Sequence, residues 1–194
     1  MNDYDDMEKN RANFVPLSPL SLISRTAALY PDRQAVVHGD RRYTWADVFS
    51  RCRQLSSGLK GLGIGRGDTV AVMAANTPEM IECHYGVAAS GGVLNTINTR
   101  LDPDTIAYIL QHGEARVLIC DTAFSTSVEA ALKSIGDSHG ITVIDIADSE
   151  NASGGTRLGK MDYEALLESG DPEAEWSLPG DEWDALALNY TSGT

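Results

Sequence analysis

Residues 63–80 read GIGRGDTVAVMAANTPEM, and this stretch carries the strongest signal for the fold class. After a glycine-rich turn, residues 69–74 form a nearly unbroken apolar run, which is typical of a strand buried on both faces. Thr77 and Pro78 then begin a helix that we predict to end near Ser90, because proline suits the first helical turn. A buried strand followed directly by a helix is the repeating unit of a parallel sheet.

The same unit repeats toward the C-terminus, where Asp102-Pro103 begins another helix. We predict further strands over 93–97, 117–120, 141–146 and 185–190, helices over 125–134 and 163–168, and a polar loop over 148–160. This alternation predicts an α/β fold with a mostly parallel sheet flanked by helices and right-handed crossovers.

An N-terminal helix and a β-hairpin are predicted before the sheet. Residues 1–17 are expected to form a loose arm, Ser18-Pro19 begins the helix, and residues 35–44 form the hairpin. A long helix follows, with Thr44 as N-cap and Asp47 completing a capping box. Its apolar residues recur at helical spacing and are predicted to pack on the core: Trp45, Val48, Phe49, Cys52, Leu55, Leu59 and Leu62.

The charge of the chain is strongly acidic and unevenly distributed. The 194 residues carry a formal net charge of −13. Residues 1–97 hold 10 acidic and 10 basic side chains, whereas residues 98–194 hold 18 acidic and 5 basic ones. This balance argues against nucleic acid as a partner, because phosphate backbones select basic surfaces. We interpret the acidic half as a solvated surface, and a docking face for a basic partner is the alternative.

The sequence shows no targeting or membrane-spanning segment. The first ten residues lack the basic and apolar regions of a signal peptide. Residues 83–99 contain no charged side chain, but their small and polar residues favour a buried element over a membrane span. The cysteines, Cys52, Cys83 and Cys120, form no CxxC pair and predict free thiols without zinc. A cytoplasmic location is therefore predicted.

Neither the glycine-rich stretch at 61–68 nor the histidines indicate a ligand site. Residues 61–68, GLGIGRGD, lack the third glycine of a GxGxxG dinucleotide loop and lie between a helix and a strand, which is the reverse of the required order. They fit a glycine C-cap and turn. The histidines show no ligand pattern, are interpreted as ordinary surface or core residues, and predict no metal site: His38, His84, His112 and His139.

The last ten residues, ALALNYTSGT, place small hydroxyl-bearing residues directly after a predicted strand. Their backbone N–H groups and hydroxyls are suited to hold a triphosphate. The candidate ATP-phosphate-binding residues are Thr191, Ser192, Gly193 and Thr194. A plain surface turn is the alternative on composition alone, since no Walker A motif is present.

The stretch YTSGT (190–194) resembles the phosphate loop of the acyl-adenylate-forming, or AMP-binding, superfamily. In that family the loop continues to a Pro-Lys-Gly sequence that this chain does not contain. Three upstream stretches match in family order: RRYTWADV (41–48), the opening stretch 63–80, and GVAASGGVLNTINTRLDPDTIAYIL (86–110). The resemblance implies that residues 18–194 are the N-terminal portion of the large adenylating domain, truncated inside the phosphate loop.

The resemblance also implies a two-step ligase that uses ATP, Mg²⁺ and CoA. A carboxylate attacks the α-phosphate of ATP, and the CoA thiol then attacks the acyl-adenylate. In the family, the catalytic lysine, the metal-binding Glu and the ribose-binding Asp lie beyond this stretch. No catalytic or metal-binding residue is therefore assigned in this chain, which alone is expected to be inactive. Its lysines receive no catalytic role: Lys9, Lys60, Lys133 and Lys160.

The stretches NFVPLSPL (13–20), NTINTRL (95–101) and YEALLESGDPEAEW (163–176) resemble the acyl-CoA synthetase branch of the family. This branch implies a small or medium-chain carboxylate, for example 3-methylmercaptopropionate. Two alternatives stay open: an adenylate-forming enzyme with another acceptor, and a non-catalytic binding or scaffold protein that keeps only this half. Assembly as a homodimer also stays open.

Overall fold

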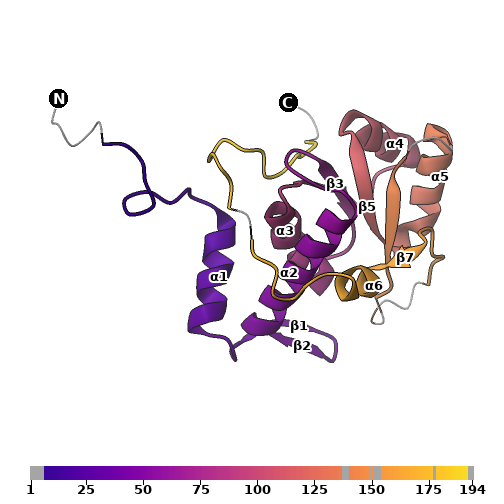
Figure 1. Ribbon diagram of the computed structural model, residues 1–194. Coiled ribbons are helices and arrows are strands. Elements are labelled where there is room, and N and C mark those ends of the chain that lie inside the picture. Colours follow the sequence, from indigo (N-terminus) through magenta and orange to yellow (C-terminus); the bar gives the residue numbers. More distant parts are fainter. Residues whose placement is uncertain (1–6, 137–139, 149, 151–153, 177, 192–194) are drawn as a thin grey trace.

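The structure is a computed structural model that describes residues 7–136, 140–148, 150, 154–176 and 178–191. A five-stranded, fully parallel sheet in the order β4-β3-β5-β6-β7 forms its centre (Figure 1). The strands are β3 (Thr69–Met73), β4 (Val93–Thr96), β5 (Ala115–Asp121), β6 (Thr142–Ile146) and β7 (Met161–Asp162). The predicted α/β fold is confirmed, while the two-residue strand β7 was not predicted.

Helices cover both faces of this sheet. The helices are α1 (Pro19–Leu29), α2 (Trp45–Gly61), α3 (Pro78–Ser90), α4 (Pro103–His112), α5 (Ser125–Ile135) and α6 (Tyr163–Glu168). Helices α2, α3 and α6 pack on one face, and α4 and α5 pack on the other (Figure 1).

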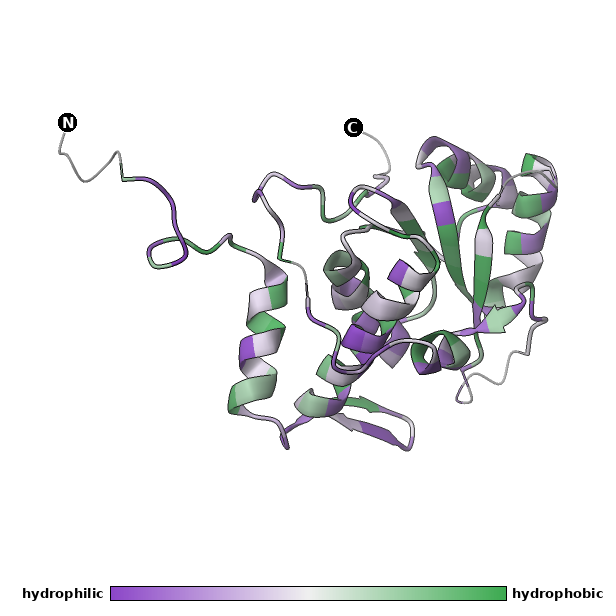
Figure 2. Cartoon of the chain, in the orientation of Figure 1, coloured by the Kyte–Doolittle hydropathy of each residue, from purple (hydrophilic) through white to green (hydrophobic). Residues whose placement is uncertain are grey.

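The alternation of side chains along β3 explains why its sequence is apolar throughout. Val70 and Val72 point into the core beneath α2, α3 and α6. Ala71 and Met73 point into the core beneath α4 and α5. Every residue of β3 is buried, and Figure 2 shows the central strands as mostly hydrophobic. A strand covered on both faces loses the polar alternation of a half-exposed strand.

The predicted helix starts agree with the capping geometry at three helices. Ser18 Oγ accepts a hydrogen bond from the Leu20 amide at the start of α1. Thr44 and Asp47 form the capping box of α2, with Thr44 N donating to Asp47 Oδ2 over 2.8 Å. Asp102 Oδ1 accepts from Thr105 N over 3.0 Å at α4. These caps satisfy donors that a helix start leaves unpaired.

The apolar stripe of α2 packs on two hydrophobic cores, as predicted, with Trp45 and Phe49 only partly buried against the smaller one. Leu55 and Leu59 are fully buried against the sheet. Trp45 and Phe49 are only half-buried, and the Phe49 ring makes an edge contact with Trp176, with 4.8 Å between ring centroids. The N-terminal turns of α2 extend past the sheet and pack on the hairpin and on the chain after α6.

The hairpin consists of β1 (Gln34–His38) and β2 (Arg41–Thr44), paired antiparallel as predicted. It is tied to the carboxyl end of the sheet by ion pairs. Arg41 contacts Glu79 at 2.5 Å and Asp148 at 3.1 Å, and His38 Nε2 lies 2.9 Å from Asp148.

The predicted last strand, 185–190, is wrong as a regular strand. Only an isolated parallel bridge joins Leu94 to Ala187. Leu94 N donates to Leu186 O over 3.1 Å, and Leu188 N donates to Leu94 O over 2.8 Å. The segment is also not buried, since Leu186 is 42% exposed. It lies along the outer edge of β4, and within the described part of the chain its backbone pairing is with Leu94 alone.

Candidate functional site

The candidate site lies where segment 185–191 reaches the carboxyl edge of the sheet. The bridge between Leu94 and Ala187 is parallel, so the segment runs in the same direction as β4. Thr191 is exposed and comes after the level at which β4 ends. Ligands of open parallel sheets bind outside the carboxyl ends of the strands. Of the four predicted phosphate-binding residues, Thr191 has this position, while Ser192, Gly193 and Thr194 lie outside the described residues.

Asn95 of β4 holds one side of this segment. Its Nδ2 donates to the Leu188 carbonyl over 3.1 Å. The side chain is 1% exposed, and its Oδ1 has no hydrogen-bond partner among the described residues. Buried amides are almost always fully bonded, so this oxygen is an exception. No role for Asn95 was predicted from the sequence, although an amide side chain within the strand VLNT is unusual enough to mark the position.

Helix α4 holds the other side of the segment through Tyr190. The Tyr190 hydroxyl and His112 Nδ1 lie 2.7 Å apart. The Tyr190 ring makes edge contacts with His112 and Tyr108, at 5.8 and 6.3 Å between centroids. Burial, together with the neighbouring Tyr108, raises the pKa of Tyr190. His112 was interpreted as an ordinary histidine, and the structure places it against the residue that precedes Thr191.

Gly113 permits this close packing. A Cβ atom at this position would lie 2.8 Å from the Ile109 carbonyl oxygen, 3.2 Å from Leu188 Cδ2 and 3.4 Å from the Tyr190 hydroxyl. Its φ of −79° is ordinary, so the requirement for glycine comes from space and not from backbone conformation. Thr191 therefore follows a stretch of chain, the base of the candidate phosphate loop, that contacts with both β4 and α4 hold in place.

A second polar cluster lies at the carboxyl end of the sheet, where α3 begins and where β5 and β6 end. Glu79 and Asp148 are engaged by Arg41, and Asp121 Oδ1 accepts from Ala123 N over 2.9 Å. Burial raises the pKa of Asp121, and the carboxylates of Asp148 and Glu79 add to this rise. No group of three acidic, histidine or cysteine side chains in the described part of the chain could hold a metal.

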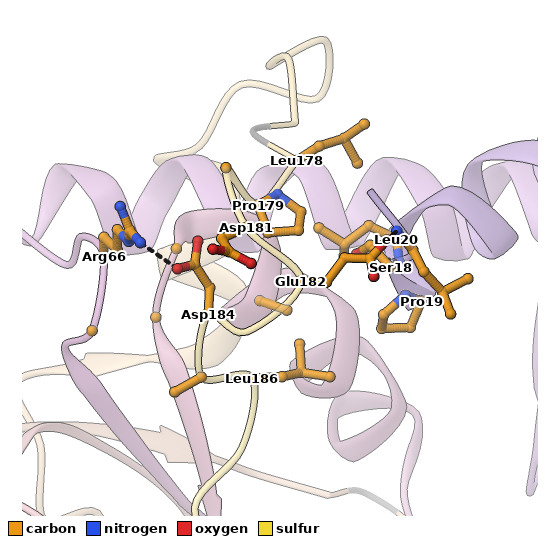
Figure 3. A pocket seen from close by; sticks show the side chains of 17 residues that line it. Ser18, Pro19, Leu20, Arg66, Leu178, Pro179, Asp181, Glu182, Asp184 and Leu186 are labelled. Atoms are coloured by element: carbon orange, nitrogen blue, oxygen red, sulfur yellow. Dashed lines mark hydrogen bonds and ion pairs between the residues drawn. The ribbon is translucent and has the colours of Figure 1, made fainter. Parts of the chain in front are cut away.

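A cavity of about 270 Å³ lies at the opposite end of the sheet (Figure 3). It is bounded by the turns that precede β3 and β4, the start of α1, and residues 178–186. Arg66 pairs with Asp184, and Glu182 accepts a hydrogen bond from Leu17 N over 2.7 Å. These two contacts link residues 182–184 to the turn before β3 and to the chain just before α1. They are separated from Thr191 by the length of a strand.

Comparison with known families places this geometry in context. The family model described as AMP-binding enzyme matches residues 23–194. The chain belongs to the AMP-binding enzyme family. The match confirms the resemblance drawn from YTSGT and the three upstream stretches.

Relatives of this AMP-binding chain include CoA ligases. It is 41% identical over 201 residues to an acetate–CoA ligase, CCL3, of Humulus lupulus, and 38% identical over 197 residues to a peroxisomal benzoate–CoA ligase of Arabidopsis thaliana. These alignments cover 99% and 98% of this chain, but 35% and 34% of the relatives. The chain thus spans about a third of the length of these relatives.

Solved CoA ligases share the fold of this AMP-binding chain. The anthranilate CoA ligase AuaEII, in complex with anthranoyl-AMP, superposes with a TM-score of 0.82 at 23% identity, covering 96% of this chain and 34% of that one. A fatty acyl CoA synthetase of Mycobacterium tuberculosis gives a TM-score of 0.72 at 28% identity, covering 89% of this chain and 32% of that one.

No described helix is long and apolar enough to cross a membrane.

Proposed function

We propose that the protein is an ATP-dependent acyl-CoA ligase and that its residues from Thr191 onward contact the ATP phosphates. The observation that carries this proposal is the place of Thr191: exposed, at the carboxyl edge of the parallel sheet, and directly after the anchored Tyr190. Family membership and the CoA ligases among the relatives support the reaction class.

The proposed reaction has two steps. A carboxylate oxygen attacks the α-phosphorus of ATP, and the bond to pyrophosphate breaks. The CoA thiol then loses its proton to solvent, its sulfur attacks the acyl carbon, and the bond to AMP breaks to leave the thioester. In the first step, hydroxyl and backbone N–H donors near Thr191 donate hydrogen bonds to the triphosphate and stabilise its negative charge. Each such bond to a charged group contributes about 1.5–3 kcal/mol. Mg²⁺, when bound, neutralises phosphate charge.

The acid is proposed to be a small or medium-chain carboxylate. Names of the relatives include ligases for acetate, butyrate and 2-methylpropanoate, but also for trans-cinnamate and benzoate. We keep 3-methylmercaptopropionate among the candidate acids, on branch resemblance alone. An apolar pocket discriminates by about 1–3 kcal/mol per methylene group, so several short acids should react at graded rates.

The location of the enzyme is part of the proposal. The cytoplasm is the proposed compartment, in keeping with free thiols at Cys52, Cys83 and Cys120. Four of the relatives, which are ligases for small or aromatic acids, are named as peroxisomal, which makes the peroxisome the alternative. Localisation of a tagged full-length protein separates the two compartments.

A substrate panel tests the reaction class and the acid together. The full-length protein is incubated with ATP, Mg²⁺ and CoA and with acetate, butyrate, 3-methylmercaptopropionate, benzoate or palmitate, and acyl-CoA is quantified. We expect acyl-CoA from the short acids. Pyrophosphate release without acyl-CoA would identify another acceptor. Absence of both products with every acid would favour the binding or scaffold alternative and contradict the proposal.

A further inference from the structure

The hydrogen-bond pattern at Leu188 departs from a parallel ladder. Leu94 bonds to Leu186 and Leu188 through its own N–H and C=O groups, as one residue does in a parallel pair. In a continued ladder, the Leu188 carbonyl would next accept from the N–H of Thr96. That carbonyl instead accepts from the side chain of Asn95, over 3.1 Å.

This substitution ends the pairing at the point where the chain must leave the sheet. The Asn95 carboxamide takes the place of a backbone donor, so residues after Leu188 make no backbone bond to β4 in the described part of the chain. Two residues further on, Tyr190 is fixed to His112 of α4. At Thr191 the chain therefore leaves the sheet in a defined direction, which the side chain of Asn95 helps to set.

The burial of Asn95 indicates that this residue serves to position the chain and does not serve stability. The residue is 1% exposed, it follows the apolar Val93 and Leu94 in β4, and its Oδ1 has no partner among the described residues. A buried amide with one unpaired oxygen is less stable than an apolar side chain of similar shape. Leucine would fill this volume without the unpaired oxygen, but it could not hold the Leu188 carbonyl.

We infer that Asn95 is a positioning residue for the ATP-phosphate loop: it ends the pairing of segment 185–190 with β4 and fixes the direction in which Thr191 leaves. This inference rests on the proposed ligase function. Asn95 affects the adenylation step, in which the triphosphate is held, and leaves the transfer of the acyl group from acyl-adenylate to CoA unaffected, because pyrophosphate has by then departed.

The test separates the two half-reactions in the full-length protein. Asn95→Leu and Asn95→Ala are compared with wild type in acid-dependent ATP–pyrophosphate exchange, and then in acyl-CoA formation from synthetic acyl-adenylate and CoA. We expect KM for ATP to rise tenfold or more in the exchange assay, with less than a twofold change in the second assay. The melting temperature of Asn95→Leu should be unchanged or higher.

Ser90→Ala is the matched control, since Ser90 is a buried polar residue near the opposite end of β4, where its hydroxyl bonds to Val87 O. It should leave KM for ATP unchanged. Equal losses in both half-reactions, or wild-type KM values in both Asn95 variants, would overturn the inference. A wild-type protein that catalyses no exchange would instead contradict the proposed function itself.

Discussion

The hydroxyl of Tyr190 lies 2.7 Å from Nδ1 of His112, which ties the residue before Thr191 to the last turn of α4. The bond joins residues 78 positions apart and, together with the ring contacts, fixes the end of an otherwise exposed segment. The base of the proposed phosphate loop is thus positioned by tertiary contacts.

Removing this bond should weaken the anchor. Tyr190→Phe keeps the ring but loses the hydroxyl, and we expect a loss of about 0.5–1.5 kcal/mol in the free energy of unfolding, together with a several-fold rise in KM for ATP. Tyr108→Phe is the matched control, because the Tyr108 hydroxyl has no hydrogen-bond partner among the described residues and its ring stacks on His112. Similar behaviour of the two variants would show that the hydroxyl of Tyr190 is not an anchor.

A methyl group at Gly113 should disturb the packing between the end of α4 and the chain that precedes Thr191. Gly113→Ala forces a Cβ atom to 2.8 Å from the Ile109 carbonyl oxygen and 3.2 Å from Leu188. Overpacking of this kind costs about 1–3 kcal/mol of unfolding free energy, measured by denaturant titration. Gly61→Ala is the control, since nothing lies within 4 Å of its added Cβ. A Gly113→Ala protein as stable as wild type would contradict the packing described here.

Asp121→Asn should raise stability at neutral pH. Burial and the nearby carboxylates raise the pKa of Asp121, so its charged form is disfavoured in the folded state. A raised folded pKa means that stability is lost as pH rises from the unfolded value, about 3.9. The advantage of the neutral Asn should therefore grow above about pH 4 and vanish below it. Thermal melts of both proteins between pH 3 and pH 8 measure this difference.

Asp102→Asn should change stability in the opposite direction to Asp121→Asn. The amide and hydroxyl of Thr105 lower the pKa of Asp102, so its charge stabilises the fold above the unfolded pKa and this contribution is lost on acidification. The Asn variant should be less stable than wild type at neutral pH and equal to it in acid. If Asp121→Asn followed this second pattern, the charge of Asp121 would be stabilising and the description of its environment would be wrong.

Local sequence patterns were sufficient to predict the elements whose signals are local. The apolar run of β3, Pro78 of α3 and the Thr44–Asp47 capping box each act within a few residues, and each matches the structure. Strand β7 was missed because two residues give no periodicity and its pairing depends on β6. Segment 185–190 was overpredicted because a regular strand needs pairing that its composition cannot specify.

For the site, the sequence predicted only that Thr191 follows a strand-like segment, and the role of Thr191 toward phosphate stays a prediction. In the structure this segment runs parallel to β4 and brings Thr191 past the level at which β4 ends. The partners of its base were not predictable, because Asn95 and Leu188 are 93 positions apart in the sequence and meet only through the order of the strands. Phe49 shows the related limit for the core: helical spacing identified the face of α2 but not that Trp176 would cover part of it.

The assignment of the ATP phosphates of an acyl-CoA ligase to the residues from Thr191 onward can be tested by acid-dependent ATP–pyrophosphate exchange in full-length wild type, Thr191→Ala and Thr126→Ala. Thr126 is an exposed threonine on α5, on a different element from the site. We expect exchange in wild type and Thr126→Ala, and a loss of about 10- to 100-fold in kcat/KM for ATP in Thr191→Ala, which corresponds to one lost hydrogen bond to a charged phosphate. Undiminished exchange in Thr191→Ala, or no exchange in wild type with any acid of the panel, would contradict this assignment.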